Sequence, residues 1–254
     1  MNSRIPSTSV ADQIRDLLVE FKLTAAAEEL VSRLVEADLK AALAVILEVL
    51  EHEREVRHQR RVDRLRRASK LAEGKTFETF DDKRLSRAVV RKLDELRGGE
   101  FLDNAVNVLA FGLPGVGKSH AMAALGHALV QQGRSVLFAP AYVLVQELLA
   151  AKRDLVLPRK LRKLDAFDLV ILDDIGYVKQ STDEAEVIFT LLAERYERRS
   201  TAITSNLVFS EWDRVFKNKM ATSAAIDRLV HHSVVLEFDV PSYRTQAAKA
   251  KKPT

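Results

Sequence analysis

The residues best suited to chemistry form one Gly-rich segment that follows an apolar run. Residues 112–119 read Gly-Leu-Pro-Gly-Val-Gly-Lys-Ser and match the pattern G-x-x-x-x-G-K-[ST] at every position. Glycines allow positive φ and let successive N–H groups surround a phosphate. The helix expected to begin near Lys118 adds the positive end of its dipole. The segment therefore predicts a phosphate-binding loop.

Each residue of this loop is a candidate nucleotide ligand. We expect Lys118 to reach the β- and γ-phosphates and to be catalytic, and the Ser119 hydroxyl to bind Mg²⁺. The alternative is a Gly-rich turn that matches by chance, and the strand before and helix after it argue against that. The cofactors predicted are ATP and Mg²⁺. The other candidate ligands are Gly112, Leu113, Pro114, Gly115, Val116, Gly117 and His120, of which His120 is expected to pack rather than to catalyse.

A second constellation follows a continuous apolar run. Residues 168–174 read Asp-Leu-Val-Ile-Leu-Asp-Asp, a hydrophobic strand that ends in two carboxylates. Downstream of a phosphate-binding loop, this pattern predicts that Asp173 holds Mg²⁺ and that Asp174 orients and deprotonates the attacking water. The alternative is a buried strand that ends in a polar turn. ATPases of this class often carry Glu at position 174, and Asp is one methylene shorter.

The elements that must position these residues alternate along the chain. Apolar runs predict strands, and helical patterns separate them. This alternation predicts an α/β fold, a P-loop NTPase with a central parallel five-stranded sheet covered on both faces. The expected strands are 106–111, 136–139, 169–172, 201–204 and 234–238, and the expected helices are 85–96, 121–131, 142–151, 184–199 and 221–230.

The first part of the chain has a different pattern. Glycine is absent before Gly74, and leucines recur at helical spacing. We expect residues 1–72 to form a smaller, all-helical domain that binds DNA or a partner. The polar stretch 73–83 is expected to connect it to the ATPase domain, residues 73–246, with Phe77 and Phe80 anchored in a core. Residues 247–254 are expected to be disordered.

Composition limits the class of protein. The 254 residues are 47% hydrophobic and 30% charged, with a formal charge of +4. Cysteine is absent, which excludes disulfides and thiol-ligated metals. No secretion signal and no apolar run long enough for a membrane span is recognised. We expect a cytoplasmic protein that does not bind membranes.

Basic residues gather in two clusters that are candidate contacts for a polyanion. A single helix through residues 54–70 would carry positive charge on most of its circumference and could follow phosphates without reading sequence. The alternative is a solvated helix with ion pairs to Glu51, Glu53 and Glu55. The candidate DNA contacts are Arg57, Arg60, Arg61, Arg64 and Arg67 in the first cluster, and Lys152, Arg153, Arg159, Lys160 and Lys163 in the second.

Several motifs together resemble the IstB/DnaC group of AAA+ ATPases, and within it the IstB transposition helpers. They occur in the family's order and cover about residues 100–246. The motifs that carry this resemblance are residues 112–120, Leu-Asp-Asp-Ile-Gly-Tyr at 172–177, Arg-Tyr-Glu-Arg-Arg-Ser-Thr at 195–201, Thr-Ser-Asn at 204–206, Glu-Trp at 211–212, Asp-Arg-Leu-Val-His-His at 227–232 and Ser-Tyr-Arg at 242–244.

The resemblance implies further roles. Asn206 matches the polar sensor residue that positions the water, and Arg244 matches a sensor arginine that contacts the γ-phosphate. Arg228 matches the arginine that enters a neighbouring subunit's ATP site. Alternatives remain: Asn206 could cap a turn, and Arg228 could form a surface ion pair. For Arg195, Arg198 and Arg199, a subunit interface and pairing with Glu194 and Glu197 remain open.

The resemblance also implies what ATP is used for. Proteins of this kind bind duplex DNA with little sequence preference, form homo-oligomers with ATP between subunits, and stimulate a cognate transposase during insertion-sequence transposition. A DnaC-like helicase loader that binds single-stranded DNA is the alternative within the group. Two further alternatives are a small-acceptor kinase and a nucleotide-dependent scaffold. The kinase requires a lid with catalytic arginines, which the sequence does not suggest, and the Asp173-Asp174 pair suits water activation better.

Overall fold

The computed structural model describes residues 9–177, 181–207 and 229–243. The chain divides into two compact units, residues 1–63 and 64–254, and the division falls within one long helix. Arg228, Arg244, the tail 247–254 and most of the expected helix 221–230 lie outside the described residues. The assignment of residues 1–72 to a DNA- or partner-binding domain stays a prediction.

The first unit is helical, as the sequence predicts. It contains α1 (Val10–Glu20), α2 (Thr24–Glu36) and the first part of α3 (Ala42–Ser69). The Ser9 hydroxyl accepts a hydrogen bond from the Asp12 N–H and so caps α1. Apolar faces of the three helices share one small core, made of Ile14, Leu18, Ala27 and Val31 with Leu43, Ile46, Leu47 and Leu50 packed against it.

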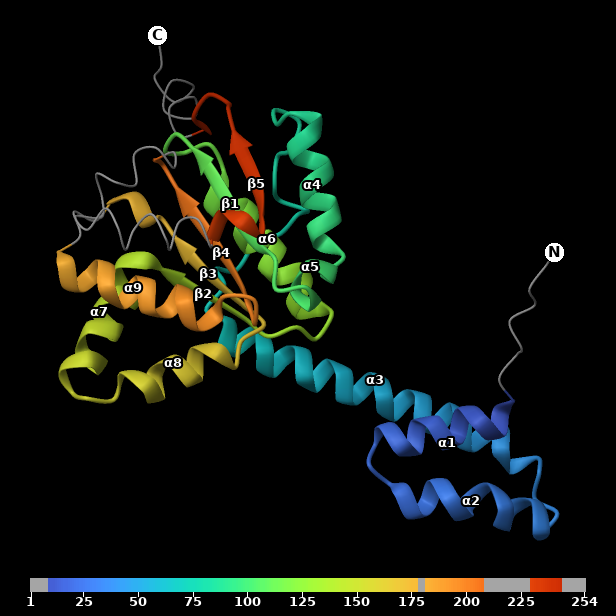
Figure 1. Ribbon diagram of the computed structural model, residues 1–254. Coiled ribbons are helices and arrows are strands. Elements are labelled where there is room, and N and C mark those ends of the chain that lie inside the picture. Colours follow the sequence, from blue (N-terminus) through green and yellow to red (C-terminus); the bar gives the residue numbers. More distant parts are fainter. Residues whose placement is uncertain (1–8, 178–180, 208–228, 244–254) are drawn as a thin grey trace. The chain divides into compact units, whose positions relative to one another are not determined.

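The second unit is built on a five-stranded, all-parallel sheet in the order β2-β3-β4-β1-β5 (Figure 1). The prediction of five parallel strands is confirmed. β4 lies between β1 and β3, so the ends of all three strands are neighbours at one edge. The strands are β1 (Asn107–Gly112), β2 (Val136–Pro140), β3 (Leu169–Asp173), β4 (Ser200–Ser205) and β5 (Ser233–Phe238).

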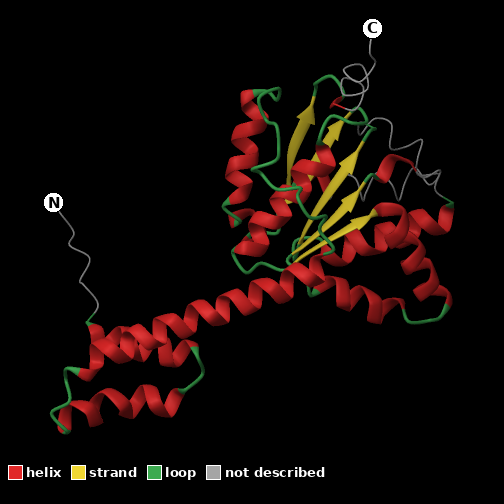
Figure 2. Cartoon of the chain, turned by 180° about the vertical axis from the view of Figure 1, so that it is seen from behind, coloured by secondary structure: helices red, strands yellow, loops and turns green. Residues whose placement is uncertain are grey.

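Helices cover both faces of this sheet (Figure 2). On one face, α6 (Lys118–Gln131) crosses the strands and α4 (Arg87–Arg97) packs beside it, next to the short α5 (Glu100–Asp103). On the other face lie α7 (Ala141–Arg153), α8 (Leu157–Asp165) and α9 (Thr182–Arg195). Within the described ranges, no helix is long and apolar enough to cross a bilayer.

The structure corrects one expected helix. The sequence predicts a helix over 184–199, but α9 begins at Thr182, within a capping box formed by Ser181 and Glu184, and ends at Arg195. Tyr196 leaves the helical conformation and Glu197 has a φ of +55°. The chain reverses here because α9 ends at the buried Arg195 and β4 begins at Ser200.

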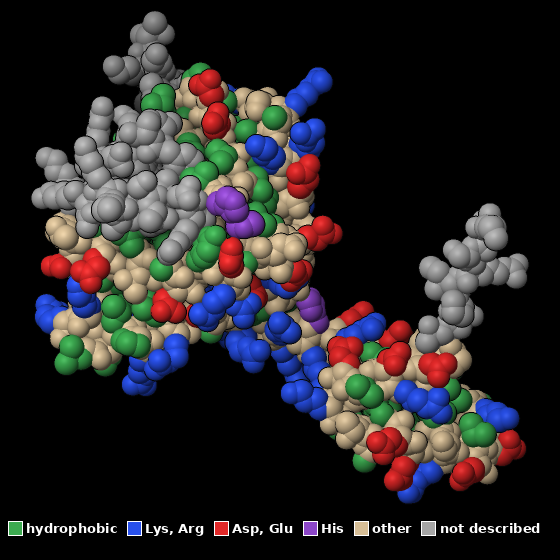
Figure 3. Space-filling view, in the orientation of Figure 1, with side chains coloured by type: hydrophobic (Ala, Val, Ile, Leu, Met, Phe, Trp, Pro, Cys, Tyr) green, Lys and Arg blue, Asp and Glu red, His purple; other side chains and the backbone are tan. Residues whose placement is uncertain are grey.

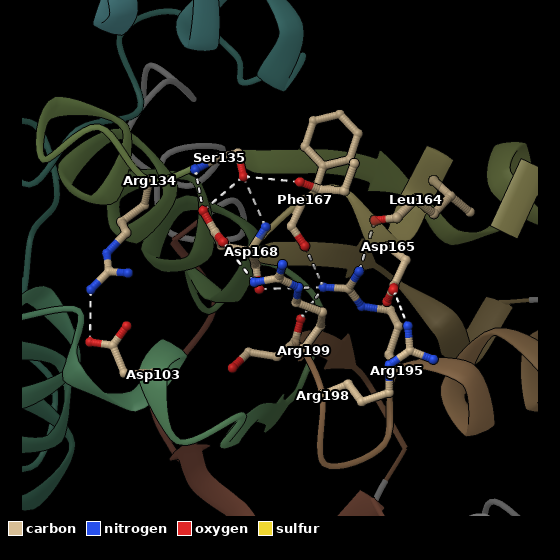
Figure 4. Close-up of polar contacts among 12 residues, drawn as sticks. Asp103, Arg134, Ser135, Leu164, Asp165, Phe167, Asp168, Arg195, Arg198 and Arg199 are labelled. Atoms are coloured by element: carbon tan, nitrogen blue, oxygen red, sulfur yellow. Dashed lines mark hydrogen bonds and ion pairs between the residues drawn. The ribbon is translucent and has the colours of Figure 1, made fainter. Parts of the chain in front are cut away.

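Among the described residues of the second unit, Arg195 is the largest buried polar side chain, with 1% of its surface exposed. Its guanidinium donates to the carbonyl oxygens of Leu164 and Phe167 at 2.8 and 2.9 Å (Figure 4). It also donates to the carbonyls of Asp168 and Ser200 and to the Thr201 hydroxyl. Burial lowers the pKa of Arg195 to about 10, so it stays charged at neutral pH. One side chain thereby joins the end of α8 to the starts of β3 and β4.

The neighbouring arginines complete this cluster. Arg198 pairs with Asp165 and Glu194, and Arg199 pairs with Asp168 at 3.1 Å. Asp168 also accepts hydrogen bonds from the N–H and hydroxyl of Ser135. Of the open alternatives, pairing with Glu194 therefore holds for Arg198, while Arg195 bonds mainly to backbone carbonyls.

Replacing Arg195 with Ala should lower the free energy of unfolding by about 3–5 kcal/mol, because several buried carbonyls lose their donor. Replacing Arg199 with Ala should cost less than about 1 kcal/mol, because its ion pair is partly exposed. Urea unfolding of both variants measures the difference. Equal effects would contradict the anchoring role of Arg195.

Candidate nucleotide-binding site

The Gly-rich loop connects β1 to α6, as predicted. Gly112 has a φ of +148° and Gly117 a φ of +102°, so both occupy backbone conformations that side chains disfavour. A Cβ at Gly112 would collide with the Phe238 carbonyl oxygen of β5. A Cβ at Gly117 would lie 3.3 Å from the Phe80 ring. The glycines are therefore required both by the turn and by close neighbours.

Lys118 begins α6 and is 7% exposed. Its ammonium donates to the carbonyl oxygens of Gly112 and Leu113 at 2.6 and 2.9 Å, so it lies over the concave side of the loop. No side chain caps the N-terminus of α6 at Gly117. The first N–H groups of the helix and the Lys118 ammonium thus offer positive charge at one place, the arrangement that binds phosphates.

Thr204 organises the two carboxylates at the end of β3. Its hydroxyl donates to Asp173 Oδ1 at 2.6 Å and accepts from the Asp174 N–H at 2.8 Å. Thr204 is fully buried in β4, so this contact holds Asp173 in one orientation. Asp174 has a φ of +66°, a left-handed conformation that Asp tolerates better than most residues. In the sequence, Thr204 belongs to the Thr-Ser-Asn motif, but the motif does not indicate this role.

Asn206 follows β4 and lies against the turn after Asp174. A Cβ on Gly176 would collide with Asn206 Oδ1, which leaves no room for a side chain there. This oxygen is buried and has no hydrogen-bond partner among the described residues. Since Phe111 of β1 pairs with Ser205 of β4, Asn206 stands level with Gly112. The structure thus brings the predicted loop, carboxylates and sensor residue to one edge of the sheet.

A cavity of about 340 Å³ opens beside the loop. One wall is the loop and the start of α6, and the other is the connecting segment that contains Thr79, Phe80 and Asp81. Tyr243 lines the cavity from the C-terminal side. The sequence predicted Phe80 only as a core anchor and gave Tyr243 no role. Contacts between segments so distant in the chain leave no signal in local spacing.

Tyr243 joins three segments. Its backbone N–H donates to the Gly115 carbonyl at 2.9 Å, and its hydroxyl donates to the Asp81 carbonyl at 2.8 Å. Burial and the nearby Asp81 carboxylate raise the pKa of Tyr243, so the hydroxyl keeps the proton that it donates. The Arg84 guanidinium lies 4.5 Å from the centre of the Tyr243 ring.

His120 fastens the connecting segment to α6. Its Nε2 lies 3.1 Å from the Thr79 hydroxyl and 3.2 Å from the Thr76 carbonyl, and its ring packs on Phe80. Burial lowers the pKa of His120, which favours the neutral ring. These contacts agree with packing as the main role of His120.

The residues fit ATP and Mg²⁺. Gly112 and Gly117 form a cradle that a Cβ would fill, and Lys118 supplies a buried positive charge beside it. The Ser119 hydroxyl and the Asp173 carboxylate are oxygen ligands of the kind that Mg²⁺ prefers. The cavity beside the loop is the natural place for the base and sugar of the nucleotide.

The candidate DNA contacts differ in what they already bind. Arg57 pairs with Glu53 and stacks on Phe21, 4.2 Å from the ring centre. Lys152 pairs with Asp183 and Glu186, and Lys160 pairs with Glu147. Arg153 lies 3.8 Å from Asp154. In the part of the chain that the structure describes, the candidates that are exposed and make no ion pair are Arg60, Arg61, Arg64, Arg67, Arg159 and Lys163.

The end of α3 lies close to α8 within the second unit. Glu147 of α7 pairs with Lys160 of α8 and lies 4.0 Å from Lys70, which follows α3. Figure 3 shows Lys and Arg side chains gathered along the lower edge of this unit. The end of α3 and α8 therefore contribute to one positively charged surface.

Solved structures with the same fold define the class. The DnaC helicase loader aligns with a TM-score of 0.56 at 19% identity, covering 65% of this chain and 97% of that chain. The replication initiator DnaA bound to AMPPCP and single-stranded DNA aligns with a TM-score of 0.56 at 17% identity, covering 72% and 56%. The fold is that of the DnaC and DnaA AAA+ ATPases.

The sequence comparisons are more specific. The family described as IstB-like ATP binding protein matches residues 13–251. An insertion-sequence ATP-binding protein of Sinorhizobium fredii is 43% identical over 205 residues, 80% of this chain and 69% of that protein. The IS21 ATP-binding protein of Pseudomonas aeruginosa is 39% identical over 198 residues, 77% and 74% of the two chains. The chain belongs to the IstB-like ATP-binding proteins.

Replacing Thr204 with Val should raise the Mg²⁺ concentration needed for half-maximal ATP turnover by about 10- to 100-fold, because Asp173 loses the hydroxyl that orients it. Nucleotide affinity measured without Mg²⁺ should not change. Thr204→Ser keeps the hydroxyl and serves as the control. An unchanged Mg²⁺ requirement in Thr204→Val would remove Thr204 from this role.

Replacing Tyr243 with Phe should speed dissociation of a fluorescent ATP analogue about 3- to 10-fold, because the bond to the Asp81 carbonyl is lost. Tripolyphosphate, which has no base, should bind as before. Tyr142→Phe is the matched control, since Tyr142 is 61% exposed. Equal weakening of both ligands would show that the bond supports the loop rather than the cavity.

Proposed function

We propose that this protein is an ATPase that assembles on duplex DNA in its ATP-bound state and recruits or stimulates a transposase during insertion-sequence transposition. The observation that carries the proposal is the meeting of the phosphate-binding loop, Asp173, Asp174 and Asn206 at one edge of the sheet. The names of the relatives, all ATP-binding proteins of insertion sequences, support the biological setting.

The residues of the site have distinct tasks in the proposed hydrolysis. Lys118 and the N–H groups at the start of α6 bind the phosphates and stabilise charge on the transferred group. Asp174 accepts the proton of the attacking water, and Asn206 orients that water. Ser119 and Asp173 would hold Mg²⁺, which would neutralise phosphate charge when bound. The Thr204 hydroxyl fixes the positions of the Asp173 carboxylate and the Asp174 backbone.

ATP would also link subunits. Arg228 and Arg244 lie outside the described residues, and their roles rest on the motifs around them. In the proposal, Arg244 contacts the γ-phosphate within its own subunit. Arg228 enters the site of a neighbour, so that ATP binding favours the homo-oligomer and hydrolysis releases it.

DNA binding is the second half of the proposal. The exposed cations of α3 and α8 can contact phosphates without reading base sequence, which gives salt-dependent binding. An oligomer that repeats this surface would follow a long duplex, and a curved one would bend it.

The alternative function is a helicase loader that binds single-stranded DNA. The observation that favours it is the likeness to the DnaC helicase loader, which extends over 97% of that chain. A transposition helper and a helicase loader differ in the form of DNA that they bind.

The deciding experiment measures ATP turnover and oligomer size with random-sequence duplex, with single-stranded DNA and without DNA. Turnover and assembly promoted by duplex support the transposition helper. Promotion by single strands alone supports the helicase loader. No response to either form of DNA would refute the DNA-binding part of both proposals.

Replacing Asp174 with Asn should reduce ATP turnover by about 10²- to 10⁴-fold, because the general base is lost while the side-chain shape is kept. ATP binding should persist, and the protein should stay assembled on duplex. Asp94→Asn, which changes an exposed carboxylate of α4, serves as the control. Normal turnover in Asp174→Asn would place the base elsewhere.

A further inference from the structure

The turn between α7 and α8 presents one leucine in an unusual way. The Leu155 N–H donates to the Lys152 carbonyl, and the Val156 N–H donates to the Ala151 carbonyl at 2.8 Å. This pair of bonds is the Schellman motif that ends many helices. The residue at its centre takes a left-handed conformation, and Leu155 has a φ of +57°.

Two physical preferences oppose leucine at this position. Glycine is the usual residue in a left-handed helix end, because a side chain there clashes with the backbone. The Leu155 side chain is also 89% exposed, the highest exposure among the large hydrophobic residues described. The other non-glycine residues described with positive φ are polar or small: Lys22, Asp38, Lys70, Ala105, Asp174 and Glu197. Folding gains nothing evident from leucine at this turn.

The turn is supported by α8, which follows it and packs against the core. Pro158 lies in the first turn of α8, where its fixed φ suits a helix start. Leu161 and Leu164 bury the apolar face of α8, and Arg195 binds the Leu164 carbonyl at its end. Leu155 is therefore presented by a rigid support.

Basic side chains flank the turn in the sequence. Arg153, two residues before Leu155, has a side chain that is 80% exposed and lies 3.8 Å from Asp154, the acidic residue directly before Leu155. Arg159, Arg162 and Lys163 of α8 are exposed and, in the described part of the chain, make no ion pair. An exposed apolar side chain among exposed cations suits a partner with phosphates outside and apolar surfaces inside. Duplex DNA has this composition, since its stacked bases lie between two phosphate backbones.

We propose that Leu155 is a wedge that enters the minor groove and partly unstacks one base step, while the basic residues of the turn and α8 hold the flanking phosphates. This inference rests on the proposed duplex binding and adds how the duplex is deformed. Apolar wedges of this kind kink DNA, and the cost of unstacking is offset by additional contacts to the bent duplex.

The test uses the full-length protein with ATP and Mg²⁺ on a random-sequence duplex. Permanganate detects unstacked thymines at any position, and energy transfer between dyes at the two ends of the duplex reports bending. Leu155→Ala should lower permanganate reactivity to that of the unbound duplex and reduce bending. Affinity should fall less than about fivefold, because phosphate contacts dominate it.

Three variants act as controls. Leu155→Met keeps a flexible apolar side chain and should retain the reactivity. Val45→Ala shortens a residue that is 61% exposed in the first unit and should change nothing. Arg159→Ala should weaken binding and reduce the salt dependence by about one phosphate contact, yet keep the reactivity at saturating protein.

Leu155→Gly separates a wedge from a structural role. It relieves the left-handed backbone, so the melting temperature should rise by about 2 °C while permanganate reactivity is lost. A lower melting temperature would show that Leu155 serves folding and would overturn the inference. Duplex binding by the parent protein without any thymine reactivity would also overturn it, while leaving the proposed function intact. Absence of duplex binding would refute the proposed function itself.

Discussion

Parallel pairing of β4 between β1 and β3 is the constraint on which the site depends. Parallel strands present their carboxyl ends at the same edge, so the loop after β1 and the carboxylates after β3 become neighbours, with the end of β4 between them. Thr204 uses this register to bind Asp173 and the Asp174 backbone at once. A shift of β4 by one residue would turn Thr204 to the other face and leave Asp173 unsupported.

At the opposite edge of the sheet, where β3 and β4 begin, the buried Arg195 connects the neighbouring elements. Arg195 satisfies carbonyls at the end of α8 and at the starts of β3 and β4, where parallel strands leave acceptors without partners. A buried guanidinium suits this place because it offers five donors in a fixed plane. The nucleotide edge and the edge that presents α8 are thus connected through β3, β4 and α9, all parts of one core.

Charge on α3 and α8 cannot be judged from counts of basic residues. Glu147, Glu186 and Glu53 neutralise Lys160, Lys152 and Arg57, whereas Arg159 and Lys163 remain exposed without an ion pair among the described residues. An exposed cation without an ion pair can bind a phosphate without first breaking an internal ion pair. The surface proposed for DNA is accordingly smaller than the basic clusters in the sequence.

Local chemistry in the sequence was sufficient to place the Gly-rich loop between a strand and a helix, to place the carboxylate pair at the end of a strand, and to predict the five strands. Each depends on residues within a few positions of one another, where glycine φ, strand alternation and helix dipoles act directly. The end of α9 was predicted four residues too late, because the backbone reversal at Glu197 serves a buried arginine that local pattern does not reveal.

Tertiary structure alone decided the contacts that complete the site. Tyr243 and Asp81 are 162 residues apart, and Thr204 and Asp173 are 31 apart. Likewise, only the folded chain distinguishes Lys160, which is paired, from Arg159, which is not. The reason is physical: hydrogen bonds and ion pairs act over a few ångströms in space, and the sheet register, not sequence distance, determines which side chains come within that range.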